Sequence, residues 1–126
     1  MKIINTENAP AAVGPYSQGI ITGNLLFTAG QIPLDPKTMK LVGNSIEEQT
    51  TQVLKNLNAV LETAGTSWQQ VIKTTVFLTD LADFVQMNKT YEDYLNGAKP
   101  ARSTIQVAAL PLGARIEIEV VAEIAK

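Results

Sequence analysis

The last quarter of the chain opens with Pro100-Ala101-Arg102-Ser103-Thr104 and closes with Arg115-Ile116-Glu117-Ile118-Glu119-Val120-Val121. Side chains in both segments alternate between two faces, which is typical of strands that bury one face. The connection between them, Leu110-Pro111-Leu112-Gly113-Ala114, contains residues that interrupt strands. We therefore predict an antiparallel hairpin with one apolar face and one polar face, and the polar face carries both Arg102 and Glu117.

Charged side chains on a strand ordinarily face solvent and have no further role. Two features favour a functional interpretation of this polar face. The 126 residues include no histidine and no cysteine, so any chemistry must use basic, acidic, hydroxyl or amide side chains. Pro100 also fixes the backbone two residues before Arg102, which favours a guanidinium that is held in place.

A second helix is predicted between Asp80, which caps it, and Gly97, which ends it, with Asp83 in the first turn. Asn88 is the polar member of its otherwise apolar stripe. A buried amide without partners costs about 1–3 kcal/mol, so Asn88 either bonds to loop backbone or contacts a ligand. The predicted stripe consists of Leu81, Phe84, Val85, Asn88, Tyr91 and Leu95.

The most regular local pattern predicts a helix over residues 46–64. Ser45 and Glu48 have the spacing of a capping box, and Gly65 supplies a C-terminal stop. Gly23-Asn24 indicates a two-residue hairpin turn, and the apolar run 76–78 indicates a central strand covered on both faces. Further strands are predicted over residues 2–5, 16–22, 25–29 and 71–79.

Together these elements predict one α+β domain over residues 1–126, with two helices on one face of a mixed six-stranded sheet. Gly30, which follows strand 25–29, is either a turn residue or a point where another group approaches the backbone closely. In the expected hairpin register Arg102 lies opposite Val121, about 13 Å along the strand from Glu117. A neighbouring subunit is then the natural way to bring the two groups together.

The composition disfavours several function classes. A net charge of -2 disfavours nucleic-acid binding, and the absence of histidine and cysteine disfavours a zinc site. No apolar run reaches membrane-spanning length, and the N-terminus lacks the apolar region of a secretory signal. We expect a cytoplasmic protein that uses no metal and no cofactor.

Several short motifs, in this order, resemble those of the RidA (YjgF) family of enamine and imine deaminases. The resemblance covers essentially the whole chain. The motifs are Ala12-Val13-Gly14-Pro15-Tyr16-Ser17-Gln18-Gly19, Thr28-Ala29-Gly30-Gln31-Ile32-Pro33, Pro100-Ala101-Arg102-Ser103, Leu110-Pro111 and Ile116-Glu117-Ile118-Glu119.

The resemblance implies a chorismate-mutase-like fold, a homotrimer with sites between subunits, and hydrolysis of reactive 2-imino acids. Substrates of the 2-aminoacrylate and 2-iminobutanoate type would give a 2-keto acid and ammonium. Arg102 would hold the substrate carboxylate, and Glu117 would act as base or hold the attacking water. The other substrate-binding residues implied are Tyr16, Gly30, Asn88 and Thr104.

Thr104 departs from the family pattern, because many members have cysteine there. Thiol-based regulation therefore does not carry over to this chain, whereas a contribution through the backbone does. Two rival functions are a non-catalytic trimer that binds keto acids and regulates a partner protein, and a ribonuclease. The acidic charge and the lack of histidine disfavour the ribonuclease.

Overall fold

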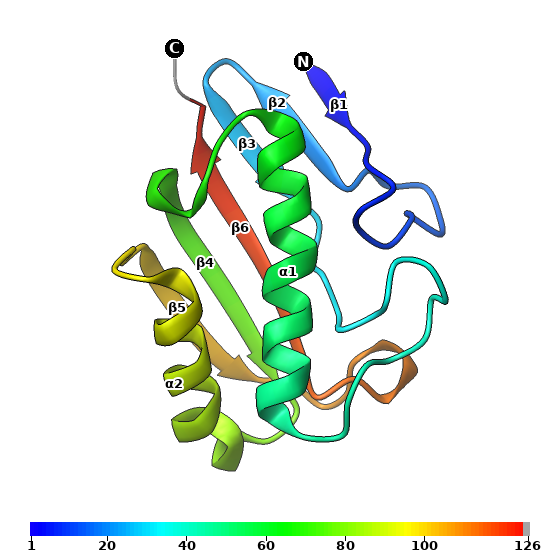
Figure 1. Ribbon diagram of the computed structural model, residues 1–126, viewed down its shortest axis with the longest axis vertical. Coiled ribbons are helices and arrows are strands. Elements are labelled where there is room, and N and C mark those ends of the chain that lie inside the picture. Colours follow the sequence, from blue (N-terminus) through cyan, green and yellow to red (C-terminus); the bar gives the residue numbers. More distant parts are fainter. Residues whose placement is uncertain (125–126) are drawn as a thin grey trace.

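A mixed six-stranded sheet forms one layer of the molecule, and two helices lie on one of its faces (Figure 1). The computed structural model describes residues 1–124. The predicted α+β architecture is confirmed. The strands are β1 (Lys2–Ile4), β2 (Gly19–Thr22), β3 (Leu25–Thr28), β4 (Val71–Leu78), β5 (Ala101–Gln106) and β6 (Ile116–Glu123), and the helices are α1 (Ile46–Ala64) and α2 (Phe84–Leu95).

Helix α1 has the predicted bounds because its ends are determined by local hydrogen bonds. The Ser45 hydroxyl accepts from the backbone N–H of Glu48 at 3.1 Å, and the Glu48 carboxylate accepts from the N–H of Ser45 at 3.4 Å. Gly65 ends the helix in the left-handed conformation, with φ of 83°. The face toward the sheet is fully buried, and it includes Val53, Leu54, Leu57, Val60 and Leu61.

The second helix differs from its prediction at the N-terminus. Asp80 does act as a cap, since its carboxylate accepts from the N–H of Ala82 at 2.9 Å, but it caps a 3-10 turn, Leu81–Asp83, and α2 begins after that turn. Val85 is 79% exposed and does not belong to the buried stripe. Met87 is buried in its place, because the helix starts at Phe84 and turns a different face toward the sheet.

The predicted hairpin of the last quarter is wrong. Strand β5 runs parallel to β4, whereas β6 lies antiparallel between β3 and β4, in the order β1-β2-β3-β6-β4-β5. Residues 107–115 pass over the end of β4, where Val107 donates to the Leu78 carbonyl and Thr79 donates to the Arg115 carbonyl. Both edges of β4 are thus hydrogen-bonded, and this arrangement satisfies more backbone groups than an isolated hairpin would.

Strand β4 is central in the sheet, but only one of its faces is covered by helices. Residues on the helix side, such as Val76 and Leu78, are fully buried, while Thr75 and Phe77 on the other side are partly exposed. The predicted cover on both faces is therefore wrong for the single chain. The face without helices is called the open face below. No helix among residues 1–124 is long and apolar enough to cross a membrane.

Candidate active site

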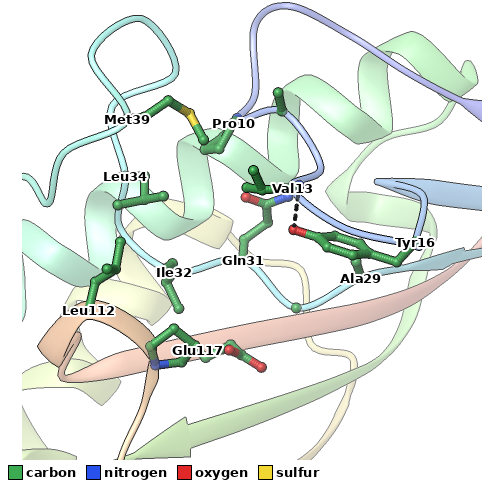
Figure 2. A pocket seen from close by; sticks show the side chains of 13 residues that line it. Pro10, Val13, Tyr16, Ala29, Gln31, Ile32, Leu34, Met39, Leu112 and Glu117 are labelled. Carbon is green, nitrogen blue, oxygen red and sulfur yellow. Dashed lines mark hydrogen bonds between the residues drawn. The ribbon is translucent and has the colours of Figure 1, made fainter.

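A cavity of about 620 Å³ lies beside the N-terminal part of β6 (Figure 2). The segments that surround it come from the loop before β2, the loop after β3 and the turn before β6. Most of the lining is apolar, and Glu117 is the one carboxylate among the lining residues. Other lining residues include Pro10, Val13, Ile32, Leu34, Met39 and Leu112.

Glu117 is half-buried on the side of β6 that faces away from the helices. Burial raises the pKa of its carboxyl above the usual value, and the negative charge of Glu119 raises it further. Among the described residues, no cation lies within ion-pair distance of Glu117. A carboxylate in such surroundings accepts a proton more readily than an exposed one does, which suits a general base.

Gly30 provides the space that the Glu117 side chain occupies. A Cβ atom at position 30 would lie only 2.7 Å from Cδ of Glu117, closer than Cβ atoms approach other heavy atoms. Two hydrogen bonds join the segment after β3 to β6 here: Gln31 N–H donates to the Ile118 carbonyl at 2.9 Å, and Ile118 N–H donates to the Gln31 carbonyl at 3.1 Å. Of the two interpretations of Gly30, close approach of another group is therefore the correct one.

Tyr16 lies across the cavity, with half of its side chain exposed. Its hydroxyl accepts a long hydrogen bond, 3.4 Å, from the N–H of Val13, as Figure 2 shows. The loop that carries both residues is fixed by Gln18, which is 2% exposed. The Gln18 amide donates to the carbonyls of Thr6 and Pro10 at 3.0 and 2.8 Å.

Gln18 is a structural residue of the site that sequence reasoning missed. Its only signal in the sequence is its position within the motif that contains Tyr16. A buried amide must have its hydrogen bonds satisfied. The loop backbone provides these partners, but only the folded chain reveals which carbonyls they are.

Arg102 lies in a second, separate cavity of about 350 Å³ between β5 and α2. Its Nη1 donates to Oδ1 of Asn88 at 2.7 Å, and its Cζ lies 4.9 Å from the ring centroid of Tyr91 and 5.5 Å from that of Phe84. Asn88 thus satisfies its amide oxygen with Arg102, rather than with loop backbone. No carboxylate pairs with Arg102 within the part of the chain that the structure describes, where the one ion pair joins Arg115 to Asp83.

An arginine that is oriented by neutral partners keeps a full positive charge and free donors. The aromatic rings and the Asn88 oxygen favour the cation without neutralising it. The arrangement can bind an anion, and the planar guanidinium favours a carboxylate held by two parallel hydrogen bonds. The second cavity is therefore a candidate carboxylate-binding pocket.

The prediction that Arg102 and Glu117 share one polar face is wrong. Arg102 pairs with Thr74 of β4, on the helix side, and Glu117 pairs with Phe77, on the open face. The offset of three residues along β4, from Thr74 to Phe77, and the two strand spacings put their Cα atoms about 14 Å apart. Within one chain the two side chains point to opposite sides of the sheet and do not form one site.

Thr104 lies on the same side of β5 as Arg102, where it pairs with Val76 of β4. Its hydroxyl oxygen is buried and has no hydrogen-bond partner among the described residues. The chain therefore has two separate groups of predicted site residues. We call Tyr16, Gly30 and Glu117 the carboxylate half-site, and Asn88, Arg102 and Thr104 the guanidinium half-site.

Comparison with known proteins bears on what these half-sites do. The family described as "Endoribonuclease L-PSP", which is the RidA/YjgF family, matches residues 6–124. This chain belongs to the RidA/YjgF family. Its members carry names of different kinds, since the family description names an endoribonuclease and two relatives are named deaminases.

Two relatives and one solved structure illustrate the similarity. "Reactive Intermediate Deaminase A, chloroplastic" of Arabidopsis thaliana is 52% identical over 96% of this chain and 65% of that protein. "2-iminobutanoate/2-iminopropanoate deaminase" of Mus musculus is 46% identical over 96% of this chain and 90% of that protein. The crystal structure of E. coli TdcF with bound serine covers 99% of this chain and 100% of that one, with a TM-score of 0.95 and 41% identity.

Gly30→Ala tests the contact between the loop after β3 and the Glu117 side chain of β6 in this RidA/YjgF chain. The added methyl group would force Glu117 to move, and we expect a loss of about 1–3 kcal/mol in the free energy of unfolding, together with loss of any activity that needs Glu117. Urea denaturation measures the first effect. In a Glu117→Ala background the same substitution should cost much less, because the clash is gone; an equal cost in both backgrounds would contradict this contact.

Proposed function

We propose that this protein hydrolyses 2-imino acids of the 2-aminoacrylate and 2-iminobutanoate type to the 2-keto acid and ammonium. The observation that carries the proposal is the Glu117 carboxylate, which is half-buried, has a raised pKa and has no cation partner in the described chain. A site that only binds a carboxylate ligand has no use for such a group, because a buried negative charge repels the ligand. The names of the Arabidopsis and mouse relatives support the same reaction.

The proposed reaction needs water, a base and an anchor. A protonated imine carbon is electrophilic, so water adds to it when a base accepts the water's proton, and Glu117 is that base. The resulting carbinolamine carries the amino and hydroxyl groups on one carbon. Its C–N bond breaks when the nitrogen receives the proton from Glu117. As the carbonyl forms and ammonia leaves, the Glu117 carboxylate accepts the hydroxyl proton and passes it to ammonia, which gives ammonium. Arg102 holds the substrate carboxylate throughout, which keeps the imine carbon beside the water.

The separation of the two half-sites supports a site built from two copies of the chain. The carboxylate half-site of one copy and the guanidinium half-site of its neighbour would face the same substrate. When one surface region of a chain binds a different region of the next copy, the copies form a closed ring if the rotation from copy to copy adds up to a full turn. The number of copies that we propose is three, as the family resemblance implies.

Apolar side chains on the open face support association of this kind. Ile3, Phe27 and Ile105 lie on this face and are 61%, 44% and 45% exposed in the single chain. Exposed apolar groups on a sheet face typically mark a surface that another protein covers.

Light scattering should give the mass of three chains; a fully active monomer would refute the proposal of a site between subunits.

An assay of ammonia release tests the reaction itself. The unstable imine is generated in the cuvette by an amino-acid oxidase, and its hydrolysis is followed with and without the protein. We expect the protein to accelerate hydrolysis of the imine clearly. A keto acid that binds without any acceleration would favour the rival function, a non-catalytic ligand-binding trimer that regulates a partner protein.

The pH dependence of turnover provides a second test, with a predicted sign. The base must be ionised, so activity falls as the pH drops through the pKa of Glu117, which is raised. The acid limb should therefore lie at higher pH than for an ordinary glutamate. Glu119→Gln removes the neighbouring negative charge and should move the limb to lower pH, while burial keeps it above the ordinary value. An acid limb of kcat/KM that stays unchanged or moves upward would exclude Glu117 as the titrating group.

A further inference from the structure

The cavity beside Glu117 is larger and more apolar than a three- or four-carbon imino acid requires. Its volume of about 620 Å³ is within the range of roughly 300–1,000 Å³ found for pockets that hold drug-sized ligands. Figure 2 shows Met39, Leu34 and Leu112 at one side of this cavity and Tyr16 at the other. The side with these three apolar residues offers no charge and lies away from the predicted chemistry.

The backbone at Met39 and Leu112 is unusual. Three non-glycine residues among positions 1–124 have positive φ: Met39 (58°), Asn96 (47°) and Leu112 (59°). Asn96 ends α2, where this conformation is ordinary. The other two both line the cavity, and long apolar side chains rarely adopt this conformation because it is sterically unfavourable.

Local hydrogen bonds fix both residues in place. Met39 N–H donates to the Asp35 carbonyl at 2.8 Å, and the Asp35 carboxylate accepts from Lys37 N–H at 2.7 Å, so the turn that holds Met39 is closed twice. Leu112 lies inside the turn closed by the bond from Ala114 N–H to the Pro111 carbonyl, at 3.1 Å. Glycine would form either turn with less strain, yet each position carries a long side chain at the cavity. Strained residues that line a site are candidates for a functional role.

We infer that Met39 and Leu112 determine substrate specificity. They form an apolar wall at which 2-imino acids with long apolar side chains, of the size of leucine's, bind more tightly than the short 2-imino acids of the proposed reaction, which the protein also hydrolyses. The inference rests on the proposed function, because it takes the cavity beside Glu117 as the place where the substrate binds. Each methylene group that enters an apolar pocket changes discrimination by about tenfold or more.

Calorimetry with two stable 2-keto acids tests the wall without relying on turnover. The parent protein should bind 4-methyl-2-oxopentanoate at least tenfold more tightly than 2-oxobutanoate. Met39→Gly and Leu112→Gly should each reduce this ratio about tenfold and leave the affinity for 2-oxobutanoate within twofold. Met39→Asn should behave like Met39→Gly, because asparagine tolerates the same backbone conformation but supplies an amide in place of the thioether.

Asn96→Gly is the matched control, since it makes the same kind of backbone change outside the cavity and should leave the ratio unchanged. Thermal melting should show each variant folded, because glycine relieves the left-handed strain. Equal binding of both acids by the parent protein, or equal weakening of both by Met39→Gly, would overturn the inference. The failure of the proposed function looks different: the binding ratio and its dependence on Met39 remain, but no imine is hydrolysed.

Discussion

Arg102→Ala should abolish imine hydrolysis and weaken keto-acid binding at least tenfold, while the fold and the association of chains remain. Hydrogen bonds to a charged group contribute about 1.5–3 kcal/mol, and the guanidinium is the only cation that we place at the substrate carboxylate. In the free protein its partners are neutral: the Asn88 oxygen at 2.7 Å and two aromatic rings. Removing it therefore leaves no buried charge unpaired. Calorimetry with 2-oxobutanoate and the ammonia assay measure the two losses.

Two further variants show whether the charge or the shape of the Arg102 guanidinium is responsible for carboxylate binding. Arg102→Lys should restore little of the keto-acid affinity or the imine hydrolysis that Arg102→Ala loses. An ammonium cannot form the two parallel hydrogen bonds that hold the plane of a carboxylate. Lys99→Ala, which removes an exposed cation lining the same cavity, should have little effect. If Arg102→Ala binds the acid as well as the parent protein does, the carboxylate binds elsewhere and our assignment of the guanidinium half-site fails.

Glu117→Gln should reduce turnover by about 10²–10⁴-fold and preserve keto-acid binding, because the amide keeps the shape of the side chain but cannot accept the proton. The Gly30 backbone beside it leaves room for either side chain. A steady-state comparison of kcat with the calorimetric affinity separates chemistry from binding. Glu119→Gln serves as the control, since it removes a carboxylate from the same face and should retain turnover. Near-normal rates in Glu117→Gln would exclude this residue as the base.

Mixing the two inactive chains tests whether each site spans two copies. In oligomers reassembled from Arg102→Ala and Glu117→Gln chains, some interfaces combine an intact Arg102 with an intact Glu117. Activity should therefore return on mixing, although each variant alone is inactive. If the mixture stays inactive despite the exchange of chains, the two residues act within one chain or not together at all.

Local signals in the sequence determined the helices and the alternation of the strands. The capping box at Ser45 and the stop at Gly65 depend on hydrogen bonds between residues at most four positions apart, so the sequence alone locates α1. The alternation from Ile116 to Glu123 likewise specifies which side chains of β6 are buried. The same sequence indicated Arg102 and Glu117 as candidates, because a chain without histidine and cysteine offers few other reactive groups.

Only the tertiary structure decided which strands are neighbours and which side chains meet. An alternating strand can pair along either edge with any partner, and the choice of β6 between β3 and β4 depends on residues almost a hundred positions apart. That choice puts Arg102 and Glu117 on opposite faces of the sheet, and it brings Glu117 over Gly30. It also explains why the hairpin prediction failed. Alternation specifies the face of a side chain within its own strand. Which strands pair, and in which direction, is set by the backbone hydrogen bonds that the whole sheet must satisfy.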